Sequence, residues 1–260
     1  MGRPFGNAGE DDGSDEVEET VSQAMTRIRN LKFRSSPRST GVIPFLGYKL
    51  LRQLQPETLR SLDLSLPDGP TTVAVSNFTQ ALAPGLHHLS LDLRFVSLGL
   101  QESHAFLNCI PDFTSLQTLE ISIMLCSPYM LRNTPQEIRR IFDYVINLLT
   151  ALPPSSHTSL RRFRITWSSF DSSSPARPLA QEDLNALGPV LEDFKGLERV
   201  EFVWEGPSYD WWCPKPSVLV NAEEFIINTL VWPEGVRSAK EFLPDLRSRK
   251  ILFFSFKSAC

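Results

Sequence analysis

The residue types best suited to metal binding or catalysis are the histidines and cysteines, but their spacing suits neither role. His87 and His88 are adjacent, so they cannot chelate one ion as two histidines four positions apart on a helix can. The cysteines include no close-spaced pair, and we expect reduced thiols at Cys109, Cys126, Cys213 and Cys260. The sequence also lacks a nucleophile elbow, a phosphate-binding loop and a Rossmann glycine set. We therefore expect no enzymatic activity, no metal and no cofactor.

Three arginines are better candidates for a binding role. Arg162 and Arg164 alternate within one apolar-patterned segment, and Arg199 stands at the place of Arg162 in the next such segment. Guanidinium groups present forked donors that match the carboxylates of an acidic partner segment. The alternative is a ladder in which Glu120, Arg164 and Glu201 satisfy one another.

A second candidate surface is an aromatic cluster in a predicted loop. Tyr209, Trp211 and Trp212 fall within an insertion that runs from residue 205 to residue 216. Rigid aromatic side chains supply contact area at little entropic cost, as interface anchors require. The same residues would equally suit a cover over the end of an apolar core.

These candidates depend on a recurrent apolar pattern that predicts strands. Within each copy the last apolar residues alternate, which is the period of a strand with one buried face. Two shorter copies flank the five full ones, at Ile28, Leu31, Phe33 and at Leu252, Phe254, Phe256. The full copies are Leu59, Leu62, Leu64, Leu66; Leu86, Leu89, Leu91, Leu93; Leu116, Leu119, Ile121, Ile123; Leu160, Phe163, Ile165, Trp167; and Leu197, Val200, Phe202, Trp204.

Helical patterns separate the predicted strands. The clearest begins with the capping box Thr134-Pro135-Gln136-Glu137 and continues as an apolar stripe from Ile138 to Leu152. Weaker helical patterns cover residues 42–54, 73–82, 103–110 and 182–194, and two further capped starts follow Asn221 and Ser238. We expect loops at the insertions 126–135, 153–159 and 168–178.

The repeated unit of strand and helix resembles leucine-rich repeats, in the divergent style of the repeat regions of fungal F-box and leucine-rich-repeat proteins. First apolar positions at Ile28, Leu59, Leu86, Leu116, Leu160 and Leu197 are spaced by 31, 27, 30, 44 and 37 residues. The resemblance implies an α/β solenoid with parallel strands on one face and helices on the other. It implies about six to seven irregular repeats over residues 23–260. The asparagine of regular repeats is missing, so we expect an irregular array, and no F-box pattern is present.

Charge divides the chain into two parts. Residues 1–19 carry a net charge of −6, which leaves +2 for the remaining sequence. Such an acidic segment has too little apolar surface to fold, so we expect residues 1–22 to form a disordered tail. The tail is either simply solvated or folds back to mask the basic stretch from Arg27 to Arg38.

Together these observations predict a protein-interaction module without catalytic activity. We expect the partner to be a protein, bound through the concave sheet face and the insertion loops, at Arg162, Arg164, Arg199, Tyr209, Trp211 and Trp212. The alternative is the substrate-receptor part of a ubiquitin-ligase complex whose F-box is missing or separate. A charge of +2 is too small for nucleic-acid binding, and no apolar stretch is long enough to span a membrane. Without a secretory signal pattern, an intracellular location, cytoplasmic or nuclear, is expected.

Overall fold

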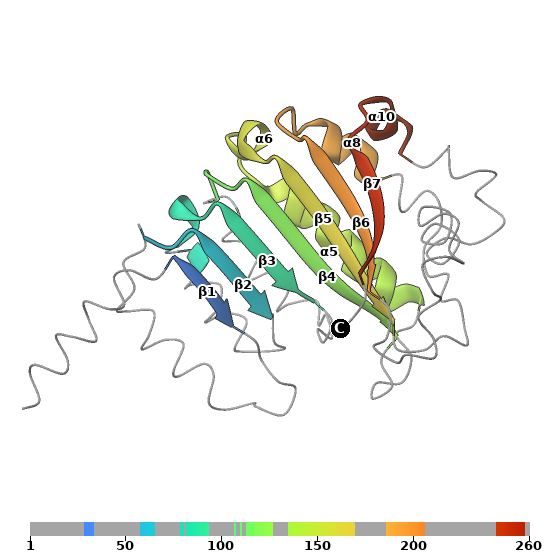
Figure 1. The fold of residues 1–260 in the computed structure, drawn as a ribbon, viewed down its shortest axis with the longest axis horizontal. Helices are drawn as coiled ribbons and strands as arrows, with labels where there is room; N and C mark the ends of the chain where they lie inside the picture. Colours follow the sequence, from blue (N-terminus) through green and yellow to red (C-terminus); the bar gives the residue numbers. More distant parts are fainter. Residues whose placement is uncertain are drawn as a thin grey trace, which may run out of the picture.

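The protein is an α/β structure built on one open parallel sheet. The computed structural model describes residues 29–33, 58–65, 79–80, 82–93, 107, 110, 113–126, 135–169, 186–205 and 243–257. Seven strands pair in sequence order, and every pairing is parallel (Figure 1). The strands are β1 Asn30–Phe33, β2 Ser61–Ser65, β3 His88–Asp92, β4 Thr118–Cys126, β5 Arg162–Ser169, β6 Arg199–Glu205 and β7 Leu252–Lys257. Each copy of the apolar pattern is therefore one strand, as predicted.

The strand register aligns equivalent residues of successive copies. Leu64, Leu91, Ile121, Ile165 and Phe202 form one row across β2 to β6, and all are buried. Because side chains alternate along a strand, this row fixes which residues point to the opposite face. The outward rows that the pattern predicts, including Asp63, Ser90, Glu120, Arg164 and Glu201, are confirmed by the pairing.

The pairing also follows the order of apolar positions within the copies. Leu62 pairs with Leu89, as their shared second place in the copies predicts, and it is the first buried residue of its strand. Both leucines remain in the core. The strand register is also more regular than the missing asparagines suggested, since its only shift in the described strands lies between Met124 and Cys126.

Backbone hydrogen bonds at the starts of the strands explain this regularity. At each step from β1 to β6, two consecutive amides of one repeat donate to a single carbonyl oxygen of the preceding repeat. The amides of residues 60 and 61 donate to Arg29 O, those of 87 and 88 to Arg60 O, and those of 117 and 118 to His87 O. The same arrangement continues at Gln117 O and Arg161 O. The main chain thus links neighbouring strand starts without an asparagine side chain.

The apolar face of the sheet packs against helices. Helix α5, Pro135–Ala151, confirms the predicted capping-box helix and lies behind the sheet in Figure 1. Its buried residues include Phe142, whose ring stacks on that of Trp167 on β5 with centroids 6.4 Å apart. The shorter elements are the 3-10 helix η1 Ala83–Gly85 and the helices α6 Ser156–Ser159, α8 Leu187–Glu192 and α10 Pro244–Ser248. None of the helices in the described ranges is long and apolar enough to cross a membrane.

The segment between α5 and β5 differs from the predicted loop at residues 153–159. It contains α6, in which buried Ser156 donates a hydrogen bond from Oγ to Phe113 O at 2.5 Å. Ser159 Oγ donates to Leu116 O at 2.8 Å. Both hydrogen bonds join the short helix to carbonyl oxygens 43 residues earlier in the sequence. The apolar periodicity of the sequence does not reveal such contacts.

Other predicted elements lie wholly or partly outside the described residues. The helical pattern of residues 182–194 contains the six-residue helix α8, and its residues 182–185 are outside the described ranges. Several predicted segments lie outside the described ranges altogether. They are the tail 1–22, the helical pattern 42–54, the insertion 205–216 beyond Glu205, and the capped helix starts at Asn221 and Ser238.

Two glycines provide a test of backbone packing between α6 and the start of β6. A Cβ atom on Gly196 would lie 2.2 Å from Thr158 O, whereas one on Gly188 would meet only Leu243 Cδ2, at 3.6 Å. We expect Gly196→Ala to lower the free energy of unfolding by about 1–3 kcal/mol because the two backbones must separate. Gly188→Ala, within α8, should leave it unchanged or raise it by up to about 1 kcal/mol. Denaturant melts measure both, and equal losses would contradict this packing.

A second comparison tests which face each residue of β5 occupies. Ile165 is fully buried, while the Arg164 side chain is 28% exposed. We expect Ile165→Ala to cost about 2–5 kcal/mol of unfolding free energy and Arg164→Ala about 1 kcal/mol or less. Comparable losses in urea melts would mean that the strand presents the opposite face.

Candidate functional site

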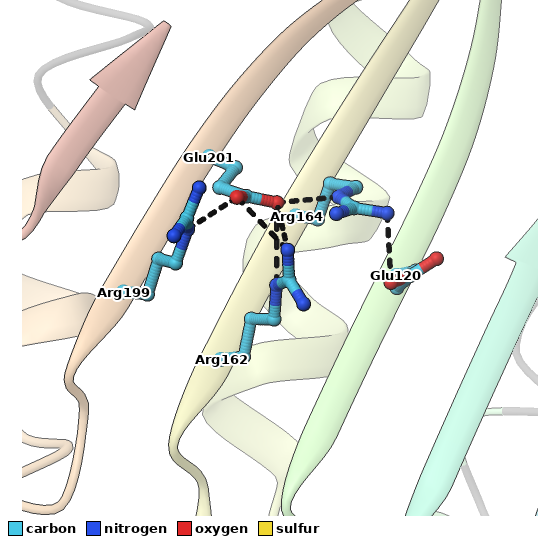
Figure 2. A network of polar contacts seen from close by, with 5 residues as sticks. All are labelled: Glu120, Arg162, Arg164, Arg199 and Glu201. Atoms are coloured by element: carbon cyan, nitrogen blue, oxygen red, sulfur yellow. Dashed lines mark hydrogen bonds and ion pairs between the residues drawn. The ribbon is translucent and has the colours of Figure 1, made fainter. Parts of the chain in front are cut away.

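The candidate site is a group of charged side chains on the outward face of β4, β5 and β6. We call it the Glu201 cluster, and Figure 2 shows its members, Glu120, Arg162, Arg164, Arg199 and Glu201. Because side chains alternate along a strand, all five lie on the face opposite the buried row of Ile165. The three candidate arginines predicted from the sequence therefore do come together.

Glu201 is the centre of the cluster. Its Oε2 accepts hydrogen bonds from Arg162 Nε at 3.2 Å and Nη2 at 2.9 Å, and from Arg164 Nε at 2.5 Å (Figure 2). Its Oε1 accepts from Arg162 Nη2 at 2.9 Å and from Arg199 Nε. Three guanidinium groups thus share one carboxylate, whose side chain is only 5% exposed.

Glu120 extends the cluster by one strand. Arg164 Nη1 lies 3.0 Å from Glu120 Oε1, so Arg164 joins the carboxylates of β4 and β6. This pairing confirms the predicted ladder of Glu120, Arg164 and Glu201. The pattern did not reveal that Arg162 and Arg199, in the neighbouring row, also turn toward Glu201.

The surroundings of Glu201 favour its ionised form. Burial alone would raise the pKa of this carboxyl group, but hydrogen bonds from Arg162 and Arg164, together with their charges, lower the pKa overall. The glutamate consequently holds the three arginines as a fixed anion. The whole cluster carries three positive and two negative charges, which leaves a net charge of +1.

An aromatic ring adjoins the cluster on β7. Phe253 pairs with Glu201 in the sheet register, and the Arg199 guanidinium lies over its ring, 4.5 Å from the centroid. Phe253 is 40% exposed and is the only exposed large hydrophobic residue reported within the described part of the chain. A signal for Phe253 is present in the sequence, because this apolar residue breaks the alternation of the last copy between the inward positions Leu252 and Phe254.

The outward face is not exposed everywhere. Thr166, Ser168 and Val203 lie on it by parity, yet they are 9%, 7% and 5% exposed. A partner could therefore reach the rows that contain Arg162 and Arg164, but not the next positions along β5 and β6. The predicted loop residues Tyr209, Trp211 and Trp212 lie outside the described residues.

Residues that could hold a metal ion are not grouped in the described ranges. No set of three or more His, Cys, Asp or Glu side chains in those ranges has a suitable arrangement. His87 and His88 lie at the start of β3, and only His88 belongs to the strand.

Replacing the central carboxylate tests the cluster, with Glu198 as a matched control. Glu201→Gln should lower the free energy of unfolding at neutral pH by about 1–3 kcal/mol, because three arginines lose a shared charged acceptor. A lowered folded-state pKa stabilises the fold above the ordinary glutamate pKa, and this contribution disappears as pH falls through the folded-state value. The difference in the free energy of unfolding between wild type and Glu201→Gln should therefore become smaller at acidic pH.

Within the described part of the chain, Glu198 forms an ion pair with Arg161 alone, and its side chain is 70% exposed. Glu198→Gln should melt close to wild type at every pH. The central role of Glu201 would be contradicted if the loss of unfolding free energy in Glu201→Gln stayed constant with pH. It would also be contradicted if this loss equalled that of Glu198→Gln. Urea melts between neutral and acidic pH supply the measurement.

Comparisons with known proteins do not assign the chain to a family. No model of a known protein family matches the chain. No curated protein matches it either. The case for a function accordingly rests on the sheet, its outward face and the Glu201 cluster.

Proposed function

We propose that the chain is a leucine-rich-repeat-like solenoid that acts as a protein-interaction module without catalytic activity. In this proposal the outward face of the sheet is the concave binding surface, and the insertion that contains Tyr209, Trp211 and Trp212 borders it. The proposal is supported by one observation above all. The two faces of the same sheet differ in character over β1 to β4 and at the Glu201 cluster.

The inward face is apolar and covered, whereas the outward face is polar and partly open. Inward residues such as Leu91, Ile121 and Ile165 are fully buried. Ten outward residues of β1 to β4 are polar and retain part of their exposure: Asn30, Lys32, Ser61, Asp63, His88, Ser90, Asp92, Thr118, Glu120 and Ser122. A parallel sheet usually has both faces covered by helices, so a polar open face favours a binding surface.

The size of this face suits a protein segment. Neighbouring strands lie about 4.8 Å apart, so the seven strands span roughly 29 Å. Side chains from every strand can contact a single extended segment or the surface of a domain. The polar composition also matches interface rims, while Phe253 supplies an apolar contact at one end.

A bulky substitution in the middle of the face tests the proposal. Ser90 lies on β3 between Asp63 and Glu120 in the register, and we expect Ser90→Trp to weaken partner binding by about tenfold or more. The matched control is Asn147→Trp on the exposed side of α5, which should bind as wild type does. Affinity purification with quantitative mass spectrometry, followed by titration of the partner, provides the measurement.

Thermal melts of both variants separate a blocked face from a damaged fold. Equal binding by Ser90→Trp and wild type would contradict use of this face. The double change Trp211→Ala and Trp212→Ala addresses the bordering insertion, where weaker binding with an unchanged melt is expected. Recovery of ubiquitin-ligase adaptors by the wild-type chain would instead favour a substrate-receptor role.

A further inference from the structure

We propose that the Glu201 cluster is the docking point for an acidic segment of the protein partner, with Phe253 contacting an apolar residue of that segment. This inference rests on the proposed function, because it names the chemistry of a partner on the same face. It goes further in assigning the recognised group, a side-chain carboxylate, and the residues that bind it.

The arginines have donors left over after binding Glu201 and Glu120. A guanidinium group carries five N–H donors. Arg162 uses Nε and Nη2, Arg164 uses Nε and Nη1, and Arg199 uses Nε. Among the described residues, no partner is recorded for Arg162 Nη1, Arg164 Nη2 or either Nη group of Arg199. These groups belong to side chains that are 37%, 28% and 48% exposed.

The positions of the arginines are fixed before any partner arrives. Glu201 holds all three, and the ring of Phe253 supports the Arg199 guanidinium. Binding usually loses conformational entropy when long side chains become ordered. Here the fold already orders these arginines, so this loss on binding is smaller. Glu201 is nearly buried, so it restrains the arginines and leaves their outer donors for a second carboxylate.

The charges around the cluster favour a short acidic protein segment. The net charge of +1 is local, because Asp92 lies on the neighbouring strand β3 and Asp63, which is paired with Lys32, lies on β2 beyond it. A long polyanion such as a nucleic acid would meet these carboxylates, whereas a few acidic residues over β5 to β7 would not. Phe253, exposed beside Arg199, adds an apolar contact that a free phosphate ion would leave unused.

Fluorescence anisotropy with the full chain tests this inference directly. The probe is a short fluorescein-labelled peptide of glutamates around one central phenylalanine. We expect saturable binding that weakens as salt shortens the Debye length below about 10 Å. Arg199→Ala should weaken binding by about tenfold, since charge-assisted hydrogen bonds are lost. Arg199→Lys should fall between this variant and wild type because it keeps the charge without the fork.

The matched control is Arg161→Ala. Arg161 is 54% exposed and pairs with Glu198 outside the cluster, so its loss should leave peptide affinity unchanged. Phe253→Ala should weaken binding of the phenylalanine-containing peptide but not of a peptide with glycine at that place. Thermal melts confirm that each exposed-site variant remains folded.

Several outcomes would overturn the inference. They are the absence of saturable binding, equal losses for Arg161→Ala and Arg199→Ala, and full competition by inorganic phosphate. If the acidic residues 10–19 of the chain itself occupied the cluster, the labelled peptide would likewise show no saturable binding. If the peptide fails while Ser90→Trp still blocks a captured partner, the proposed function stands and the acidic-segment inference falls.

Discussion

The structure depends on one constraint, the requirement that every strand place the apolar residues of its repeated pattern on the same side of the sheet. Because side chains alternate, a shift of one residue in any pairing would bury charges and expose leucines. The row of Leu64, Leu91, Ile121, Ile165 and Phe202 shows the constraint being met across five strands. Burial of this row also decides, without any further interaction, which residues form the opposite face.

The Glu201 cluster is a consequence of that parity combined with local electrostatics. A glutamate on the outward face would ordinarily be solvated, but three arginines bind this one and its side chain is only 5% exposed. Desolvation of a carboxylate is tolerated only where charged donors compensate it. The cluster therefore joins β4, β5 and β6 on the polar side, opposite the packing of Phe142 against Trp167 on the apolar side.

Strand positions and their register could be predicted because both follow from alternation, which is local in sequence. The helix at Pro135–Ala151 could be predicted for the same reason, since its cap and stripe are local. Convergence of Arg162 and Arg199 on Glu201 could not, because it depends on side chains reaching diagonally between rows. The short helix Ser156–Ser159 and the close approach at Gly196 also escaped prediction, since contacts with distant residues determine them.

The sequential order of the strands has a consequence for how the chain acquires its structure. Each strand pairs only with strands adjacent to it in the chain, so no pairing requires the two ends of the sheet to meet early. Loop closure between neighbours is entropically cheaper than closure across the whole chain. Assembly can begin where the strand pairing is longest, at β4 and β5, and spread outward in both directions. Loss of a terminal strand would then shorten the sheet while leaving its centre intact.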